Sequence, residues 1–142
     1  MNTTQLTTEK SEYLLLFRGH EWHVGMSAEE IQAAMTRFQD WFQGLEKKGI
    51  LKGARPLQQS GKVISGKGGR HVADGPYAES KESVGGYVML AAGSFDEALA
   101  IAKTAPMLDY GVIVELRPLA TECPVMEKLR QAEAKELAGV GV

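Results

Sequence analysis

One pattern occurs twice in this chain and limits the folds open to it. A short apolar run, residues 13–17 and again residues 86–92, is followed by a Ser-x-x-Glu box and by apolar residues that recur every three or four positions. Such a box caps a helix, because the Ser hydroxyl accepts the N–H of the Glu while the Glu side chain reaches back to the Ser N–H. Each half therefore predicts a strand and then an amphipathic helix that begins after Ser27 or Ser94.

Helix breakers predict where the chain returns to a sheet. Gly49 follows the first predicted helix and Pro106 the second, since glycine favours a left-handed C-cap and proline cannot continue a helix. Strand-like segments come next, at residues 50–57 and 111–118. Two strand–helix–strand units predict an α+β, ferredoxin-like βαββαβ fold, with both helices on one face of a mainly antiparallel sheet. The apolar stripe of the first helix is expected to be buried on that sheet (Ile31, Ala34, Met35, Phe38, Trp41, Phe42 and Leu45).

Two smaller elements complete the predicted organisation. Residues 62–65 and 70–73 flank a glycine-rich connection and predict a hairpin inserted between the halves. Residues 125–138 predict a charged C-terminal helix. The expected division is a disordered tail at 1–12, one ferredoxin-like domain at 13–119, and a C-terminal helix and tail at 120–142.

The second face of the predicted sheet has no helix to cover it. A run as apolar as residues 13–17 is unfavourable on a wet surface, so a second copy of the chain is expected to cover this face. The expected assembly is a homodimer with sheets face to face, a dimeric α+β barrel.

The composition excludes several classes of partner. The chain has 142 residues and a net charge of −2, with acidic and basic residues interspersed, so neither nucleic acid nor an anionic membrane is an expected partner. No apolar stretch approaches the roughly 18–20 residues of a membrane span. The polar N-terminus lacks the features of a signal peptide, and the only cysteine, Cys123, fits a reducing compartment, so a cytoplasmic location is expected.

The loop at residues 74–87 is the expected functional region. Asp74 precedes a Gly-Pro turn, where its carboxylate would act as a general base or hydrogen-bond acceptor in a pocket, or would only cap its own backbone. Tyr77, Glu79 and Lys81 would line the same pocket, or form a solvated loop pair.

Three histidines and a few other side chains are further candidates. His20, His23 and His71 suit proton transfer at neutral pH, with His23 as the catalytic candidate beside Asp74. No cysteine or carboxylate cluster supports a metal site, and no metal or cofactor is predicted. The remaining ligand-binding or dimer-contact candidates are Trp22, Arg55 and Arg117.

Several separated motifs together resemble the YCII-related family, in its DGPF-motif branch. They are residues 14–19, 49–53, 74–82, 85–87 and 115–118, with Tyr77 where the branch usually has Phe. The resemblance implies the dimeric ferredoxin-like α+β barrel. It also implies, for some members, a proton-transfer pair of Asp and a His on the first helix, which here has no histidine. An association of DGPF proteins with extracytoplasmic-function sigma factors implies a regulatory setting.

Three functional hypotheses follow. The first is a small-molecule-binding protein whose cleft lies near the Asp-Gly-Pro-Tyr loop. The second is a small-molecule enzyme of lyase or isomerase type that transfers protons through Asp74 and a loop histidine. The third is a regulatory module that engages another protein, because ferredoxin-like dimers serve many functions.

Overall fold

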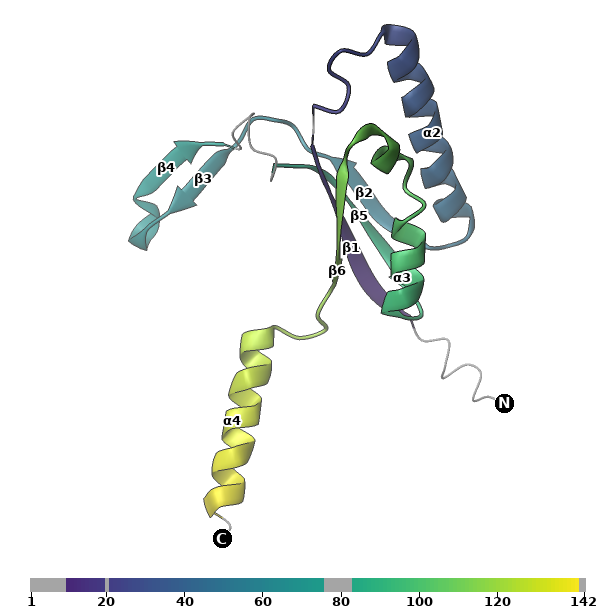
Figure 1. Cartoon of the computed structure of the whole chain (residues 1–142). Coiled ribbons are helices and arrows are strands. Elements are labelled where there is room, and N and C mark those ends of the chain that lie inside the picture. The colour runs from purple at the N-terminus through teal and green to yellow at the C-terminus, as the bar shows by residue number, and fades with distance from the viewer. Residues whose placement is uncertain (1–9, 20, 76–82, 141–142) are drawn as a thin grey trace, which may run out of the picture.

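Strand β1 (Ser11–Arg18) is an interior strand of a four-stranded antiparallel sheet (Figure 1). The structure, a computed structural model, describes residues 10–19, 21–75 and 83–140. The other strands of the sheet are β2 (Leu51–Pro56), β5 (Val84–Ala92) and β6 (Ile113–Pro118), and their order is β2-β5-β1-β6. This order is that of a ferredoxin-like βαββαβ sheet, so the predicted fold class is confirmed. β1 begins two residues before its predicted start, because Ser11 and Glu12 pair with Ala92 and Ala91.

Helices α2 (Ala28–Lys47) and α3 (Phe95–Ala102) share one face of the sheet. Alternate residues of the central strands, Leu15, Val88 and Leu90, are fully buried there. α2 packs Trp41 and Phe42 against this core, and α3 contributes Ala98 and Ala102. Side chains of a strand alternate between faces, so Leu14, Leu16, Tyr87 and Met89 belong to the other face, which no described helix covers.

The two predicted capping boxes differ in their second hydrogen bond. At α2, Ser27 Oγ accepts from the Glu30 N–H at 3.1 Å, and Glu30 Oε1 accepts from the Ser27 N–H at 2.9 Å. At α3, Ser94 Oγ accepts from the Glu97 N–H at 3.1 Å, but the Glu97 carboxylate accepts from the Gly93 N–H instead. The backbone at Ser94 is more extended, with φ of −158° against −73° at Ser27. The first box is thus complete, and the second is half-formed.

α3 ends earlier than the sequence predicts. The period of apolar residues continues to Ala105, yet the helix stops at Ala102. Proline disfavours helical backbone at the residue before it, and Ala105 accordingly has an extended ψ of 119°. Pro106 then opens the short 3-10 helix η2 (Pro106–Tyr110), which turns the chain into β6.

The apolar stripe of α2 is not buried along its whole length. Ala34, Phe38 and Leu45 are buried as predicted, but the prediction is wrong for Met35, which is 47% exposed, and for Ile31, which is half-buried. A helix of 20 residues is about 30 Å long, whereas a six-residue strand such as β2 spans about 20 Å. The first turns of α2 therefore extend past the neighbouring edge of the sheet.

The predicted hairpin is present and consists of β3 (Lys62–Ser65) and β4 (His71–Asp74), joined through the 3-10 turn η1 (Lys67–Gly69). All its residues are exposed, including Ile64 at 65% and Val72 at 59%. Figure 1 shows it extending away from the four-stranded sheet. The hairpin is an inserted arm and contributes little to the core of this chain.

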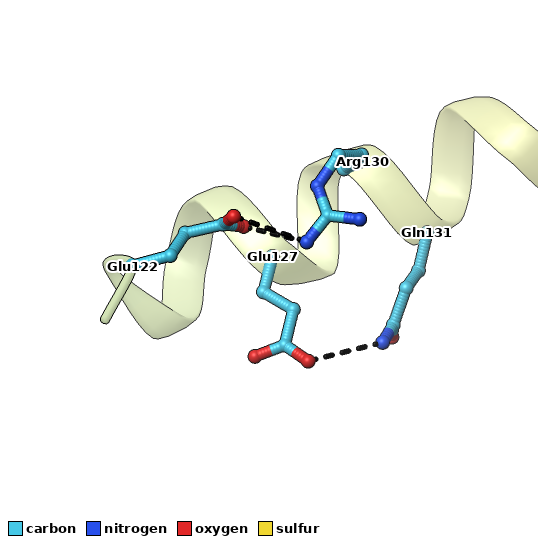
Figure 2. A network of polar contacts seen from close by, with 4 residues as sticks. All are labelled: Glu122, Glu127, Arg130 and Gln131. Carbon is cyan, nitrogen blue, oxygen red and sulfur yellow. Dashed lines mark hydrogen bonds and ion pairs between the residues drawn. The ribbon is translucent and has the colours of Figure 1, made fainter. Parts of the chain in front are cut away.

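The C-terminal helix α4 (Pro124–Val140) is also exposed along its described side chains. Its first turns are held by local contacts: Arg130 Nη2 donates to both carboxylate oxygens of Glu122, at 2.9 and 3.1 Å, and Gln131 donates to Glu127 (Figure 2). None of the described helices is long and apolar enough to cross a membrane.

Candidate functional site

A cavity of about 750 Å³ lies between the first half of α2 and the end of the sheet where β1 finishes and β5 begins. The stripe residues Ile31, which is half-buried, and Met35, which is exposed, form part of its wall. Their apolar side chains therefore face a cavity where the sequence predicts a packed core. The other lining residues are Phe17, Arg18, Gly19, Trp22, His23, Phe38, Gln39, Phe42, Ala54, Arg55, Pro56, Gly85, Gly86, Tyr87, Met107 and Val112.

Aromatic rings form one side of the cavity. Trp22 packs against Phe38 of α2 with ring centroids 5.2 Å apart, and both rings contact Tyr110 of η2, at 5.7 and 5.6 Å. The Trp22 ring also meets the His23 ring edge to face, at 5.4 Å and 71°. Aromatic pairs of this geometry add to the stability gained by burial. The loop that carries Trp22 and His23 is thus anchored on α2 and η2.

Polar contacts between Arg37 of α2 and two residues of η2, Asp109 and Tyr110, hold η2 against α2 at the surface. Arg37 donates to Asp109 Oδ2 at 2.7 Å and to the Tyr110 hydroxyl at 3.2 Å, and its guanidinium lies over the Tyr110 ring at 5.6 Å. The hydrogen bond to Asp109, with a smaller contribution from Tyr110, raises the pKa of Arg37 above its ordinary value. These contacts hold in place the segment that brings Met107 and Val112 to the cavity.

Two glycines allow the backbone to bend or approach closely at this end of the sheet. Gly19 directly follows β1 and has a φ of 102°, in the left-handed region that other residues rarely adopt. At Gly86, a Cβ would lie 3.0 Å from the carbonyl oxygen of Arg55 and 3.3 Å from Cα of Pro56. The backbones of β2 and β5 therefore approach each other closely at Gly86.

Arg18 is the charged lining residue with the most constrained environment. The pairing of β1 with β5 shifts by one residue between Phe17 and Arg18, because Gly85 of β5 is unpaired there. β1 keeps its register with β6, so Arg18 shares the uncovered face of the sheet with Leu16 and Glu115. Arg18 Nη2 donates to Glu115 of β6, and both side chains are 31% exposed. The Nε atom of Arg18 is buried and has no hydrogen-bond partner in the described part of the chain.

The structure places the predicted site residues in three groups. Trp22 and His23 line the cavity. Asp74 and His71 lie on β4 of the exposed hairpin, where Asp74 pairs with Lys62, and Arg117 lies on β6, exposed and 3.9 Å from Glu115. None of these three lines the cavity. The predictions for His20, Tyr77, Glu79 and Lys81 fall outside the described residues.

Most residues of the cavity wall are not predicted from the sequence to be site residues. The sequence assigns Phe17 to a buried strand and Phe38 and Phe42 to the buried stripe of the first helix, and it does not single out Arg18, the last residue of β1. The available signal was the length of the α2 stripe relative to the short strands that follow it. That mismatch indicates apolar side chains without a sheet beneath them.

The described residues contain no group of three or more His, Cys, Asp or Glu that could hold a metal ion. Cys123 is exposed just before α4, and hydrogen bonds from the backbone N–H groups of Met126 and Val125 lower the pKa of its thiol. It lies outside the cavity lining.

The strand order, the two helices on one face and the cavity under α2 define a ferredoxin-like α+β domain with a ligand-sized cavity. The chain belongs to the YCII-related family, since the model of the YCII-related domain matches residues 11–120.

Comparison with curated proteins found no match. Among solved structures, the chain is similar to 5-chloro-2-hydroxyhydroquinone dehydrochlorinase from Burkholderia phenoliruptrix in complex with 2,5-dihydroxybenzoquinone, with 13% identity, a TM-score of 0.42, and coverage of 78% of this chain and 95% of that one. It is also similar to hydroxynitrile lyase from Passiflora edulis, with 12% identity, a TM-score of 0.37, and coverage of 82% and 98%. TM-scores this low assign no chemistry to this chain.

Proposed function

We propose that this protein binds a small, mainly apolar aromatic molecule in the cavity under α2. The observation that carries the proposal is a cavity of about 750 Å³ walled by aromatic and aliphatic side chains, with a few polar groups among them. Ligand sites commonly have this size and this composition, in which apolar walls supply affinity and a few polar groups fix orientation. Gly85 and Gly86 also line the cavity, and both belong to residues 74–87, where the sequence predicts a cleft.

The test uses a neutral aromatic probe and a residue at the cavity wall. Met35 is 47% exposed, so Met35→Trp places a larger side chain in the cavity without overfilling the core. Isothermal titration with 2-naphthamide should show saturable binding that Met35→Trp weakens at least tenfold. Met126→Trp, on α4 at 55% exposure, is the matched control and should leave binding unchanged. Absence of binding to the unmodified protein would contradict the proposal.

A second candidate function is proton transfer on the bound molecule, with His23 as the acid or base. The observation that favours it is the position of the His23 imidazole in the cavity lining, in edge-to-face contact with Trp22. An imidazole exchanges protons near neutral pH. Asp74, the partner suggested by the sequence, is exposed on the hairpin and paired with Lys62, so this candidate rests on His23 alone.

Deuterium incorporation distinguishes catalysis from binding alone. The probe 2-tetralone is an aromatic ketone with acidic α-protons, and protein-dependent exchange of these protons in D2O is readable by proton NMR. His23→Gln should abolish the exchange while 2-naphthamide still binds. Exchange that is unchanged in His23→Gln would rule out this role.

We also propose that two copies of the chain pack through the uncovered face of the sheet. Support comes from the half-buried side chains of Leu14, Leu16, Tyr87 and Met89, which share this face. Light scattering after gel filtration should show a dimer, and Leu16→Glu should give a folded monomer. Leu137→Glu on exposed α4 is the control. A wild-type monomer at micromolar concentration would contradict this assembly.

We further propose that the chain belongs to the DGPF-motif branch of its family and that the protein is cytoplasmic. The branch is supported by the sequence from Asp74 to Glu82, of which residues 76–82 lie outside the described structure. The location is supported by the single cysteine, Cys123, which leaves no intrachain disulfide to form. The regulatory alternative stays a prediction.

A further inference from the structure

The inserted arm, residues 57–74 with β3, η1 and β4, lacks the packing that a hairpin needs. β3 and β4 form a two-stranded sheet of their own, and every residue of the arm is exposed. The cross-strand neighbours Ile64 and Val72 are 65% and 59% exposed. An isolated two-stranded hairpin is at best marginally stable in water. The arm therefore calls for a surface that covers these aliphatic side chains.

The tip of the arm is basic. Lys62, Lys67 and Arg70 are its only Lys and Arg residues, and its one carboxylate, Asp74, pairs with Lys62 at the base of the hairpin. Lys67 and Arg70 form no ion pair within the described part of the chain. The tip thus presents two cations next to the exposed aliphatic residues.

The start of α2 has the opposite charge. The entry segment, residues 21–30, contains Glu21, Glu29 and Glu30 and no Lys or Arg, and all three carboxylates are exposed. The Glu30 carboxylate accepts within the capping box, which leaves Glu21 and Glu29 available for another partner. Val24 of the same segment is 71% exposed. The entry segment therefore complements the arm in charge and also offers an apolar contact.

The two surfaces do not meet within one chain. Figure 1 shows the arm on the side of the sheet opposite to α2 and α3. The arm starts where β2 ends and the entry segment follows the end of β1, and strand pairing puts both ends at the same edge of the sheet. Packed sheets lie about 10 Å apart, whereas a strand of four residues such as β3 spans about 13 Å. The arm is thus long enough to pass a second sheet that packs on the uncovered face.

We propose that the arm of one copy of the chain docks on the entry segment of a second copy. The tip cations Lys67 and Arg70 pair with the two available carboxylates of that segment, and Ile64 and Val72 pack against Val24. This inference rests on the proposed packing of two copies through the uncovered face, and it names a second contact between them. Twofold symmetry forms the contact twice, with the same ends of both sheets together. The docked arm lies beside the cavity of the other copy, because the entry segment carries two of the residues that line it.

Charge reversal tests the docking. Sedimentation equilibrium of the full chain at about 0.01 M ionic strength measures the dissociation constant of the dimer. Lys67→Glu/Arg70→Glu should raise this constant about tenfold, as should Glu21→Lys/Glu29→Lys, because four exposed ion pairs per dimer become repulsive. All four changes in one chain should restore it to within about threefold of wild type. Lys128→Glu/Lys135→Glu on exposed α4 is the matched control and should leave it unchanged.

Salt provides a second measurement that needs only the arm variant. The wild-type dimer should weaken between about 0.01 M and about 1 M ionic strength, since the screening length falls from about 30 Å to about 3 Å. Lys67→Glu/Arg70→Glu should lose this weakening. The same weakening in that variant as in wild type would overturn the docking, even if the entry-segment variant did not fold.

The remaining outcomes separate the docking from the packing of the sheets. An unchanged dissociation constant in Lys67→Glu/Arg70→Glu would overturn the docking, and so would a chain with all four changes that dimerises no more tightly than either double variant. If Leu16→Glu is then still monomeric, packing through the uncovered face stands. A monomeric wild type would remove both proposals.

Discussion

The Nε1–H of Trp41 donates to Thr104 Oγ1 at 2.8 Å, and this hydrogen bond joins α2 to the segment just after α3. Thr104 Oγ1 in turn donates to the carbonyl of Ile101 at 2.6 Å, so the acceptor is held in place by the last turn of α3. Phe17 and Phe42 pack against the Trp41 ring, at 6.5 and 5.3 Å between centroids. Trp41 thus links α2 to the segment after α3 and supports two aromatic rings of the cavity wall, Phe17 and Phe42.

Trp41→Phe should lower the free energy of unfolding by about 1 kcal/mol beyond the effect of the smaller ring, since a net intramolecular hydrogen bond contributes about that much. Urea denaturation of Trp41→Phe, Thr104→Val and the double variant measures the coupling between them. The two effects should be less than additive, because either change breaks the same bond. Full additivity would show that the bond contributes nothing.

Gly86→Ala should destabilise the β2–β5 edge by about 1–3 kcal/mol, the usual cost of forcing extra volume into a packed site. The new methyl would meet the Arg55 carbonyl at 3.0 Å, and backbone atoms cannot rotate away as a side chain would. Gly53→Ala, in the neighbouring edge strand β2, is the matched control, because a Cβ there meets nothing within 4 Å. Thermal unfolding should rank Gly86→Ala clearly below Gly53→Ala, and equal midpoints would contradict the close approach.

The capping box of α2 should make stability pH-dependent in acid. Hydrogen bonds from the backbone and side chain of Ser27 lower the pKa of Glu30 from its ordinary value of 4.5. A carboxyl whose pKa is lower in the folded state stabilises the fold above its unfolded pKa and loses that contribution as the pH falls through the folded value. Glu30→Gln keeps a capping side chain that does not titrate. Denaturation midpoints of wild type should therefore fall relative to Glu30→Gln below about pH 4.5 and run parallel to it at neutral pH.

Cys123 should react with iodoacetamide at a lower pH than an ordinary thiol. The N–H groups of Met126 and Val125 lower the pKa of its thiol by stabilising the thiolate, which is the reactive form. The pH dependence of the alkylation rate gives the midpoint directly. The same measurement in 8 M urea, where α4 is unfolded, should return the midpoint to that of a free cysteine. Identical midpoints in both conditions would show that the helix has no influence.

The repeated strand and Ser-x-x-Glu pattern was sufficient to predict the ferredoxin-like sheet, because capping and hydrophobic period are local properties of the chain. It predicted α2 within one residue and placed β1 inside the sheet. It did not predict the end of α3: the apolar period runs to Ala105, whereas the helix ends at Ala102 and Ala105 before Pro106 is extended.

The site was harder to predict, because a cavity depends on which residues fail to pack. Trp22 and His23 are predicted from their residue types, an aromatic ring and an imidazole, and both line the cavity. Met35 carries the same sequence signature as the buried Phe38, and only the position of the sheet distinguishes them.

Because the first turns of α2 extend beyond the sheet, the length of this helix sets the size of the binding cavity. Adding or deleting one turn at the start of α2 would lengthen or shorten this wall of the cavity by about 5.4 Å, while every strand kept its partner. Insertions or deletions in α2 would thus change the size of the ligand that the cavity accepts, and the pairing of the sheet would stay the same.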